Sequence, residues 1–256
     1  MKRILITVIL FLPIFSFGQV NIKNGLVACY PFNGSAADAT GNGNDGTVNG
    51  ATLTNDRFGK TNSAYNFNGS SDYIDIPADK LKNSTFSYSA WIKPNTLPES
   101  GVAFFILSIG SDSGDQAIGL NNGYTNGTDG FTGGGYLDVG ENAFCQQGFL
   151  PNVNQWYHVV VIRNANTYLV YVNGIFICST SILSKSPFYG TGTAQATIGS
   201  RWNKGQFSDC VLDDIYLYNR AITSEEVTAL YQETTKLSPC EGGVIACHPF
   251  AVVKTK

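Results

Sequence analysis

Residues 86–94 read FSYSAWIKP, and this stretch decides the class of fold. Apolar side chains recur at every second position, as in a β-strand that turns one face toward a core. The residues between them are polar or amphipathic, so the opposite face has a different environment. The apolar members of the pattern are Phe86, Tyr88, Ala90 and Ile92.

Similar short runs lie on both sides of this stretch, separated by clusters of Gly, Asn, Asp and Ser. Residues 102–109 are almost continuously apolar, which is typical of a strand buried on both faces. Asn173-Gly174 separates two further runs and is a preferred pair for a two-residue hairpin turn. Residues 110–155 form the least regular stretch. Other strands are expected at 26–32, 64–67, 72–76, 156–162, 167–172, 175–178, 196–199 and 211–218.

One helix is expected near the C-terminus, over residues 223–231. Thr223 is a suitable N-cap, and Glu226 three residues later completes the pattern of a capping box. Many short strands with regular turns and a single late helix indicate an all-β fold. We therefore predict a two-sheet antiparallel jelly-roll sandwich with one short C-terminal helix.

Charge argues against nucleic acid as a partner. Only 14% of the 256 residues are charged, the formal net charge is −3, and no block of basic residues occurs. Proteins that bind nucleic acid need clustered Lys and Arg to neutralise phosphates.

The first 18 residues have the order of a secretory signal peptide. Basic residues at positions 2 and 3 precede an apolar stretch at 4–15, and Ser16 and Gly18 supply small side chains at a cleavage site before Gln19. A membrane anchor is the alternative, but the apolar run is shorter than the roughly 20 residues that span a bilayer. We expect a secreted protein, extracellular or at the cell surface, without a transmembrane segment in the mature chain.

The remaining chain is expected to form one domain, over residues 19–234, followed by a linker and tail at 235–256. The tail segment GVIACHPF, at 243–250, echoes GLVACYPF at 25–32. This similarity suggests the start of an incomplete second repeat, and chance similarity is the alternative.

Eight segments taken in order resemble the secreted bacterial type of laminin-G-like domain, a jelly-roll family of the concanavalin A-like lectin/glucanase superfamily. The resemblance covers roughly residues 24–232. It implies two curved antiparallel sheets, a bound calcium ion in many members, and extracellular adhesion or carbohydrate recognition. The segments are GLVACYPFNG (25–34), DATGNGNDG (38–46), AYNFNG (64–69), DYI (72–74), FSYSAWIKP (86–94), NQWYHVVV (154–161), YVNG (171–174) and DDIYLYNRAI (213–222).

The calcium expectation falls on the loop at residues 33–46, which is rich in Asp, Asn and Gly. Calcium takes six to eight oxygen ligands, and these side chains supply them. A turn-rich loop closed by its own hydrogen bonds is the alternative. Asp213 joins the ligand set because the resemblance implies that the first and last strands are neighbours. The candidate calcium ligands are Asp38, Asn42, Asp45 and Asp213.

Catalysis by paired carboxylates has little support in the sequence. Sandwich glucanases carry a Glu-x-Asp-x-x-Glu pattern on one strand, and none of the six Glu residues forms it. The adjacent acids Asp213 and Asp214 are expected on opposite strand faces, one of them taking the metal while the other pairs with Arg220 or caps backbone donors. Two solvated or hydrogen-bonded acids are the alternative. His158, within a strand, is expected to be structural.

The candidate ligand-binding residues lie in two loop regions, since loops on a rigid sandwich often carry function. Trp202 and Asn203 stand in the polar segment RWNKGQ at 201–206, where a ring and amides suit a sugar. Tyr124 and Tyr136 belong to the irregular stretch.

Six cysteines in an exported chain make disulfides plausible. The sequence does not select among the possible pairings, and Cys178 with Cys210 is the pair we name. Three functions stay open: a non-catalytic module that binds a glycan or an extracellular protein, a polysaccharide hydrolase, and a purely structural adhesion domain. We favour the first, with calcium as the expected cofactor.

Overall fold

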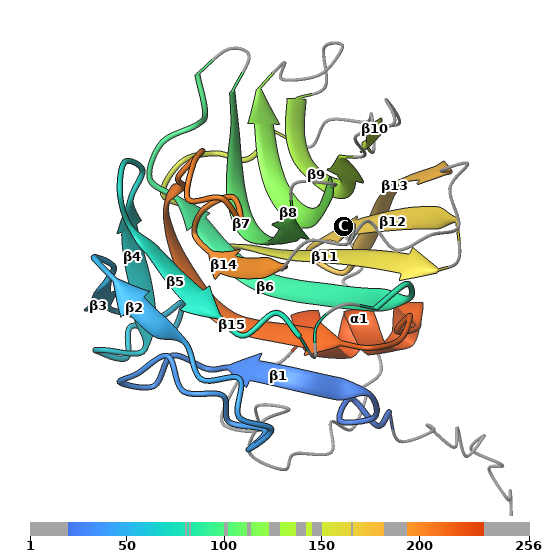
Figure 1. Cartoon of the computed structure of the whole chain (residues 1–256), viewed down its shortest axis with the longest axis horizontal. Coiled ribbons are helices and arrows are strands. Elements are labelled where there is room, and N and C mark those ends of the chain that lie inside the picture. The colour runs from blue at the N-terminus through green and yellow to red at the C-terminus, as the bar shows by residue number, and fades with distance from the viewer. Residues whose placement is uncertain are drawn as a thin grey trace, which may run out of the picture.

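The computed structural model describes residues 20–79, 81, 83–99, 102–111, 114–122, 129–136, 142–144, 150–164, 166–181 and 194–232. These residues form two antiparallel β-sheets and one helix (Figure 1). The predicted two-sheet sandwich with a late helix is confirmed. The strands are β1 (Leu26–Tyr30), β2 (Thr47–Asn49), β3 (Thr52–Thr54), β4 (Ala64–Asn68), β5 (Tyr73–Ile76), β6 (Phe86–Pro94), β7 (Val102–Ser111), β8 (Gly114–Asn122), β9 (Asp129–Tyr136), β10 (Asn142–Phe144), β11 (Tyr157–Asn164), β12 (Thr167–Val172), β13 (Ile175–Ser181), β14 (Gln195–Ile198) and β15 (Asp209–Tyr218), and the helix is α1 (Ser224–Tyr231).

The first sheet has the strand order β13-β12-β11-β6-β15-β4-β3, and β1 pairs with β15 beside this path. The second sheet has the order β10-β9-β8-β7-β14-β5-β2. Seven of these thirteen pairings join strands that are not consecutive in the chain, so long-range pairing determines the fold. In the hairpin between β12 and β13, Asn173 and Gly174 both have positive φ, as that turn requires.

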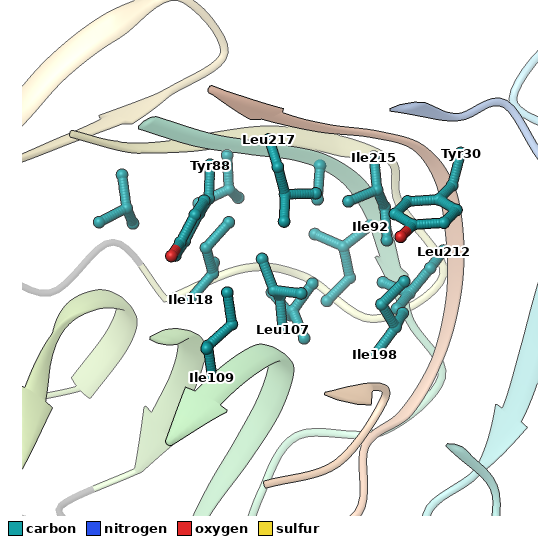
Figure 2. Close-up of a cluster of buried hydrophobic side chains, with 14 of the residues drawn as sticks. Tyr30, Tyr88, Ile92, Leu107, Ile109, Ile118, Ile198, Leu212, Ile215 and Leu217 are labelled. Atoms are coloured by element: carbon teal, nitrogen blue, oxygen red, sulfur yellow. The ribbon is translucent and has the colours of Figure 1, made fainter. Parts of the chain in front are cut away.

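The main core lies between the two sheets. Figure 2 shows side chains of the first sheet pointing toward those of the second, with Leu217 and Ile215 facing Leu107 and Ile198. These side chains are fully buried, and each contributes about 1.5–3 kcal/mol through the hydrophobic effect. The alternation predicted for β6 is confirmed, because its apolar members belong to this core.

A second apolar cluster lies on the outer face of the first sheet, where α1 packs. Val227 and Leu230 of the helix are buried against side chains of β11 and β15. The predicted capping box is confirmed: the Thr223 hydroxyl accepts from the Glu226 amide at 3.3 Å, and the Thr223 amide donates to Glu226 Oε2 at 2.7 Å.

The expectation of an irregular stretch at residues 110–155 is wrong in its first part. Strands β8, β9 and β10 lie there, and β8 pairs with β7 over most of its length. The sequences of β8 and β9 contain several Gly residues and lack clear alternation, and β10 has only three residues, so strand propensity does not reveal them. Pairing with an already buried neighbour overrides that weak local preference.

Candidate functional site

The outer face of the second sheet exposes a polar surface at β5. Ile74 and Ile76 of β5 point into the core, so the alternate residues Tyr73 and Asp75 point outward. Asp75 pairs with Thr47 of β2 on one side and with Thr197 of β14 on the other. Thr197 is fully buried and its hydroxyl donates to the Ser200 carbonyl, so the exposed polar surface lies on β2 and β5 and reaches β14 at Gln195.

The loop that joins β14 to β15 folds as a tight turn beside this surface. The Lys204 amide donates to the Arg201 carbonyl at 2.8 Å, and the Arg201 amide donates to the Gly205 carbonyl at 2.9 Å. Lys204 has φ of 59°, a left-handed conformation that is uncommon for residues other than Gly. Trp202 and Asn203 therefore occupy the tip of a well-defined turn.

Lys204 connects the turn to the sheet. Its Nζ lies 3.2 Å from Asp75 Oδ1 and 3.3 Å from Gln195 Oε1, and it stands over the Tyr73 ring at 5.6 Å. Tyr73 also approaches the Phe207 ring, with the ring centroids 6.4 Å apart. These contacts gather rings, amides and one ion pair at a single place. We call this place the β5–β14 surface: Tyr73, Asp75, Gln195, Trp202, Asn203 and Lys204.

Two of the four predicted ligand-binding residues lie on the β5–β14 surface. Asn203 is exposed, and Trp202 is half-buried with an indole Nε1 that donates to no acceptor within the described part of the chain. Tyr136 is the last residue of β9, and its side chain lies outside the described set, as does the whole of Tyr124. The side chains of Trp202 and Asn203 are thus described and those of Tyr124 and Tyr136 are not, and the ligand-binding role of all four stays a prediction.

Sequence reasoning missed the strand residues of this surface. Tyr73 and Asp75 follow from the alternation over residues 72–76, because apolar Ile74 and Ile76 assign the other residues to the outer face. Gln195 and Lys204 gave no such signal. The contacts of Lys204 with Asp75 of β5 and with Gln195 of β14 depend on the pairing of β14 with β5 and on the conformation of the turn.

The predicted calcium loop is closed by hydrogen bonds of its own. Asp38 is buried, and its Oδ1 accepts from the Cys29 amide at 3.0 Å and from the Thr40 amide at 3.0 Å. Its Oδ2 accepts from the Asn44 amide at 3.2 Å and from Asn44 Nδ2 at 3.0 Å. Burial opposes ionisation of Asp38, but these hydrogen bonds and one from the Thr40 hydroxyl hold its pKa below the usual value.

The other three predicted ligands are also engaged. Asp45 Oδ1 accepts from the Asp38 amide at 2.8 Å, and Asn42 Nδ2 donates to the Val27 carbonyl at 3.0 Å. Asp213 instead contacts Arg57. Within the described residues, no three His, Cys, Asp or Glu side chains form a group that could hold a metal ion. The four candidates are therefore not assembled as one calcium cage.

Asp213 and Asp214 meet the same cation. Arg57 Nη1 lies 2.8 Å from Asp213 Oδ2 and also contacts Asp214 Oδ2. The expectation that these carboxylates point to opposite faces is wrong, because β15 carries a bulge against β6 here and Asp214 has φ of 41°. The expected partner Arg220 instead binds Glu226 of α1.

Burial sets the protonation of this cluster. It raises the pKa of Asp213 to about 8, helped by the charge of Asp214 and opposed by Arg57. It likewise raises the pKa of Asp214, against the attraction of Arg57. His158 behaves in the opposite sense: burial, then the charge of Arg57, lowers its pKa to about 3. Asp56 and Tyr216 are the other ionisable groups that face the cluster.

These pKa values predict that stability is highest between about pH 4 and 6.5, where the opposing effects of the buried carboxyls and of His158 largely cancel, and that it falls on either side. A carboxyl whose pKa is higher in the folded state loses stabilisation as pH rises from about 4 to about 8. A buried neutral histidine makes the folded state less stable as pH falls from about 6.5 to about 3, because the unfolded chain takes up a proton that the folded chain does not. Unfolding by urea at a series of pH values should show both limbs. Asp213→Asn should flatten the fall in the free energy of unfolding between about pH 6.5 and 8.5. An unchanged fall would contradict the raised pKa of Asp213.

His158 is not arranged for catalysis. Its Nε2 lies 2.8 Å from Ser89 Oγ, but both residues are fully buried. Trp91 packs against the imidazole at 5.1 Å and Tyr231 at 6.1 Å, measured between ring centroids. His158 Nδ1 contacts no acceptor among the described residues, so a third member that orients the ring is missing from that set. The predicted structural role fits this geometry.

The predicted disulfide between Cys178 and Cys210 is wrong. Cys210 is a free, buried thiol on β15, and burial raises its pKa far above the usual value. Cys178 lies on β13, and three strands separate β13 from β15 in the first sheet. Four strand spacings amount to about 19 Å, whereas the Cα atoms of a disulfide lie within about 7 Å of each other.

One family model matches more than half of this chain. The Laminin_G_3 family model, described as the concanavalin A-like lectin/glucanases superfamily, matches residues 68–228. This range includes every residue of the β5–β14 surface and excludes the loop at 33–46. A search of curated proteins finds no match.

Several solved structures share the fold. Domain 4 of AbnA, a GH43 extracellular arabinanase from Geobacillus stearothermophilus in complex with arabinotriose, is 22% identical with a TM-score of 0.63, over 81% of this chain and 98% of that one. The binding domain of Paraclostridial Mosquitocidal Protein 1 is 21% identical with a TM-score of 0.65, over 82% and 52%. Trypanosoma rangeli sialidase in complex with sialic acid is 18% identical with a TM-score of 0.57, over 82% and 33%. The chain thus spans about half or less of the latter two.

Proposed function

Because the chain belongs to the concanavalin A-like lectin/glucanases superfamily, we propose that it is an extracellular, non-catalytic module that binds carbohydrate at the β5–β14 surface. The observation that carries this proposal is the contact of Lys204 with both Tyr73 and Asp75 on one sheet face, next to the turn that carries Trp202. A sugar offers an apolar C–H face and a rim of hydroxyl groups. Aromatic rings suit the first, and amides with one charged pair suit the second.

Carbohydrate chemistry occurs among the structures of similar fold. Domain 4 of AbnA is in complex with arabinotriose, and the Trypanosoma rangeli sialidase is in complex with sialic acid. These ligands belong to those proteins. They supply reasonable probes for this chain and support, without identifying, a carbohydrate ligand.

A hydrolase is the alternative, and the acidic residues argue against it. Glycosidases place two carboxyl groups on either side of the scissile bond, about 5 Å apart in retaining enzymes and farther apart in inverting ones. The adjacent acids Asp213 and Asp214 are buried against Arg57, where no polysaccharide reaches them. Asp75, on the β5–β14 surface, is paired with Lys204.

Trp202→Ala should weaken glycan binding about ten-fold, since loss of one stacked ring costs about 1–1.5 kcal/mol. Asn203→Ala should weaken it less. A glycan array first identifies the ligand, and calorimetry then measures the affinities. The matched control is Phe176→Ala, which removes a half-exposed ring from β13 of the first sheet. Release of reducing sugar from the bound glycan would contradict the non-catalytic proposal.

A protein partner is the second candidate, favoured by apolar side chains exposed on or beside the first sheet. Tyr231 stacks on Trp91 and closely approaches Gly174, next to Ile175 and Phe176. Loss of binding in Phe176→Ala with full binding in Trp202→Ala would favour this candidate over the glycan site.

Calcium binding stays a prediction. In its favour, Asn44 Oδ1 is a buried oxygen that accepts no hydrogen bond within the described residues, beside the buried Asp38 carboxylate. A metal bound only by the folded state stabilises that state by mass action, so excess chelator should lower the melting temperature. Calorimetry with and without chelator measures this. An identical melting curve would remove calcium from the account.

Export and disulfide formation are proposed together. Residues 1–18 lie outside the described set, and the helix within it is too short to cross a membrane. Neither Cys29 nor Cys178 is a free thiol, and we propose that each bonds a cysteine beyond the described residues. A mature N-terminus other than Gln19 would contradict the proposed leader.

A further inference from the structure

We infer that the β5–β14 surface selects neutral sugars, with the Asp75–Lys204 pair bonding two neighbouring hydroxyl groups of one sugar ring. This inference rests on the proposed function and adds the class of ligand. The charges at this surface are the first observation in its favour. Lys204 contacts both Tyr73 and Asp75, and its charge is opposed by Asp75 at 3.2 Å.

The unused hydrogen-bonding capacity of the pair matches a diol. The Lys204 ammonium has three N–H groups, and two of them serve Asp75 Oδ1 and Gln195 Oε1. The third is available to a hydroxyl oxygen. Asp75 Oδ2 receives no donor from the described part of the chain, so it is available to a hydroxyl proton. The two side chains are 37% and 39% exposed, so a ligand reaches both.

The third N–H group of Lys204 and Asp75 Oδ2 lie close together because the two side chains are in contact. Neighbouring hydroxyl groups on a sugar ring are similarly close, so one oxygen accepts from Lys204 while the next donates to Asp75. Bonds to charged groups are about twice as strong as neutral ones. The half-buried Tyr73 ring lies beneath Lys204 and adds apolar surface next to the pair for the C–H groups of the same sugar.

The turn holds Lys204 in place before the ligand arrives. Its left-handed backbone is fixed by the hydrogen bonds between Arg201 and Lys204 and between Arg201 and Gly205. Less conformational entropy is then lost on binding, which favours affinity.

An acidic sugar fits this arrangement poorly. Its carboxylate would meet the like charge of Asp75, and Lys204 is already neutralised. Arg201 does not compensate, because its guanidinium stands over the Phe105 ring at 5.7 Å and contacts Gln206. A ligand without charge avoids the repulsion and still uses both free positions.

The test compares a neutral and an acidic trisaccharide on the full chain. Arabinotriose and trigalacturonate are the probes, alongside an array of neutral, uronate-containing and sialylated glycans. Calorimetry on the wild-type protein should show neutral glycans bound at least ten-fold more tightly than their acidic counterparts. Asp75→Asn should weaken neutral binding about ten-fold and strengthen trigalacturonate binding, because Lys204 then carries an unopposed charge. Lys204→Met should weaken both ligands, and trigalacturonate more than arabinotriose, because Asp75 then carries an unopposed negative charge.

Glu225→Gln is the matched control, since it removes one negative charge from a fully exposed position on α1, and it should change neither affinity. Tighter binding of acidic than neutral glycans by the wild-type protein overturns the selectivity and leaves the proposed function standing. Unchanged affinities in Asp75→Asn, with its melting temperature intact, overturn the role of the ion pair. Binding of no glycan on the array overturns the proposed function itself.

Discussion

Arg57→Met is expected to destabilise the protein by about 3–5 kcal/mol at pH 7, the usual cost of leaving a buried charge without its partner. The side chains of Arg57, Asp213 and Asp214 are 6%, 3% and 13% exposed. Removing the guanidinium leaves two neighbouring acids in a site that already disfavours their charge. Arg57 also stands over the Trp91 ring at 4.6 Å and the Phe58 ring at 4.5 Å, so packing is lost as well.

Urea unfolding measures this loss, and the matched control is Arg220→Met. Arg220 also binds a carboxylate, with Nη2 2.5 Å from Glu226 Oε1, but its side chain is 24% exposed. Solvent screens that pair, so its loss should cost about 1 kcal/mol or less. Asp213, with a pKa of about 8, is already largely protonated at pH 7, so the deficit of Arg57→Met should come mainly from Asp214 and should shrink at lower pH as that carboxyl takes up a proton. A loss below 1 kcal/mol at pH 7 would show that the cluster does not hold the loop between β3 and β4 to the sheet.

Gly199→Ala is expected to destabilise the protein by about 3 kcal/mol, through overpacking and backbone strain together. Gly199 follows β14 with φ of 83°, in the region that side chains disfavour. A Cβ there would lie 2.3 Å from Cδ1 of Phe67, a fully buried core ring. The Gly199 amide and carbonyl also bond Ile106 and Ser208, so the backbone has little freedom to move away.

Gly59→Ala separates the two causes. Gly59 has φ of 85°, yet a Cβ there would meet no atom within 4 Å. Its replacement therefore introduces strain without a clash and should cost about 1 kcal/mol. Equal losses at the two positions, measured by urea unfolding, would contradict the close contact between Gly199 and Phe67.

The strands that alternate or read as continuous apolar runs were predictable from the sequence. The pattern from Phe86 to Ile92 gave β6 and its inner face, and Asn173-Gly174 gave the hairpin between β12 and β13. The capping residues gave the start of α1. In each case the signal is local, because side-chain periodicity and turn chemistry act within a few residues.

The missed features depend on contacts between distant residues. Arg57 meets Asp213 across 156 positions, and no local pattern marks that pairing. The bulge at Asp214 brings two adjacent carboxylates to the same cation, which regular strand geometry forbids. The order of strands separates Cys178 from Cys210, and a count of cysteines carries no information on that order.

The residues of the candidate site likewise divide into those with a local sequence signal and those that only the assembled fold brings together. Trp202 and Asn203 were recognisable as a ring and an amide in a polar loop, and Tyr73 and Asp75 as outward residues of an alternating strand. Their association through Lys204 required the fold, because β14 and the turn reach β5 only when the second sheet is assembled.

The most direct test of carbohydrate binding at the β5–β14 surface is a titration of ¹⁵N-labelled protein with the glycan identified on the array, followed by backbone amide shifts. We predict that the largest shifts fall on residues 73–75, 195–197 and 201–207. Shifts concentrated instead at residues 174–176 and 231, around Phe176 and Tyr231, or in the loop at 33–46, would contradict the account.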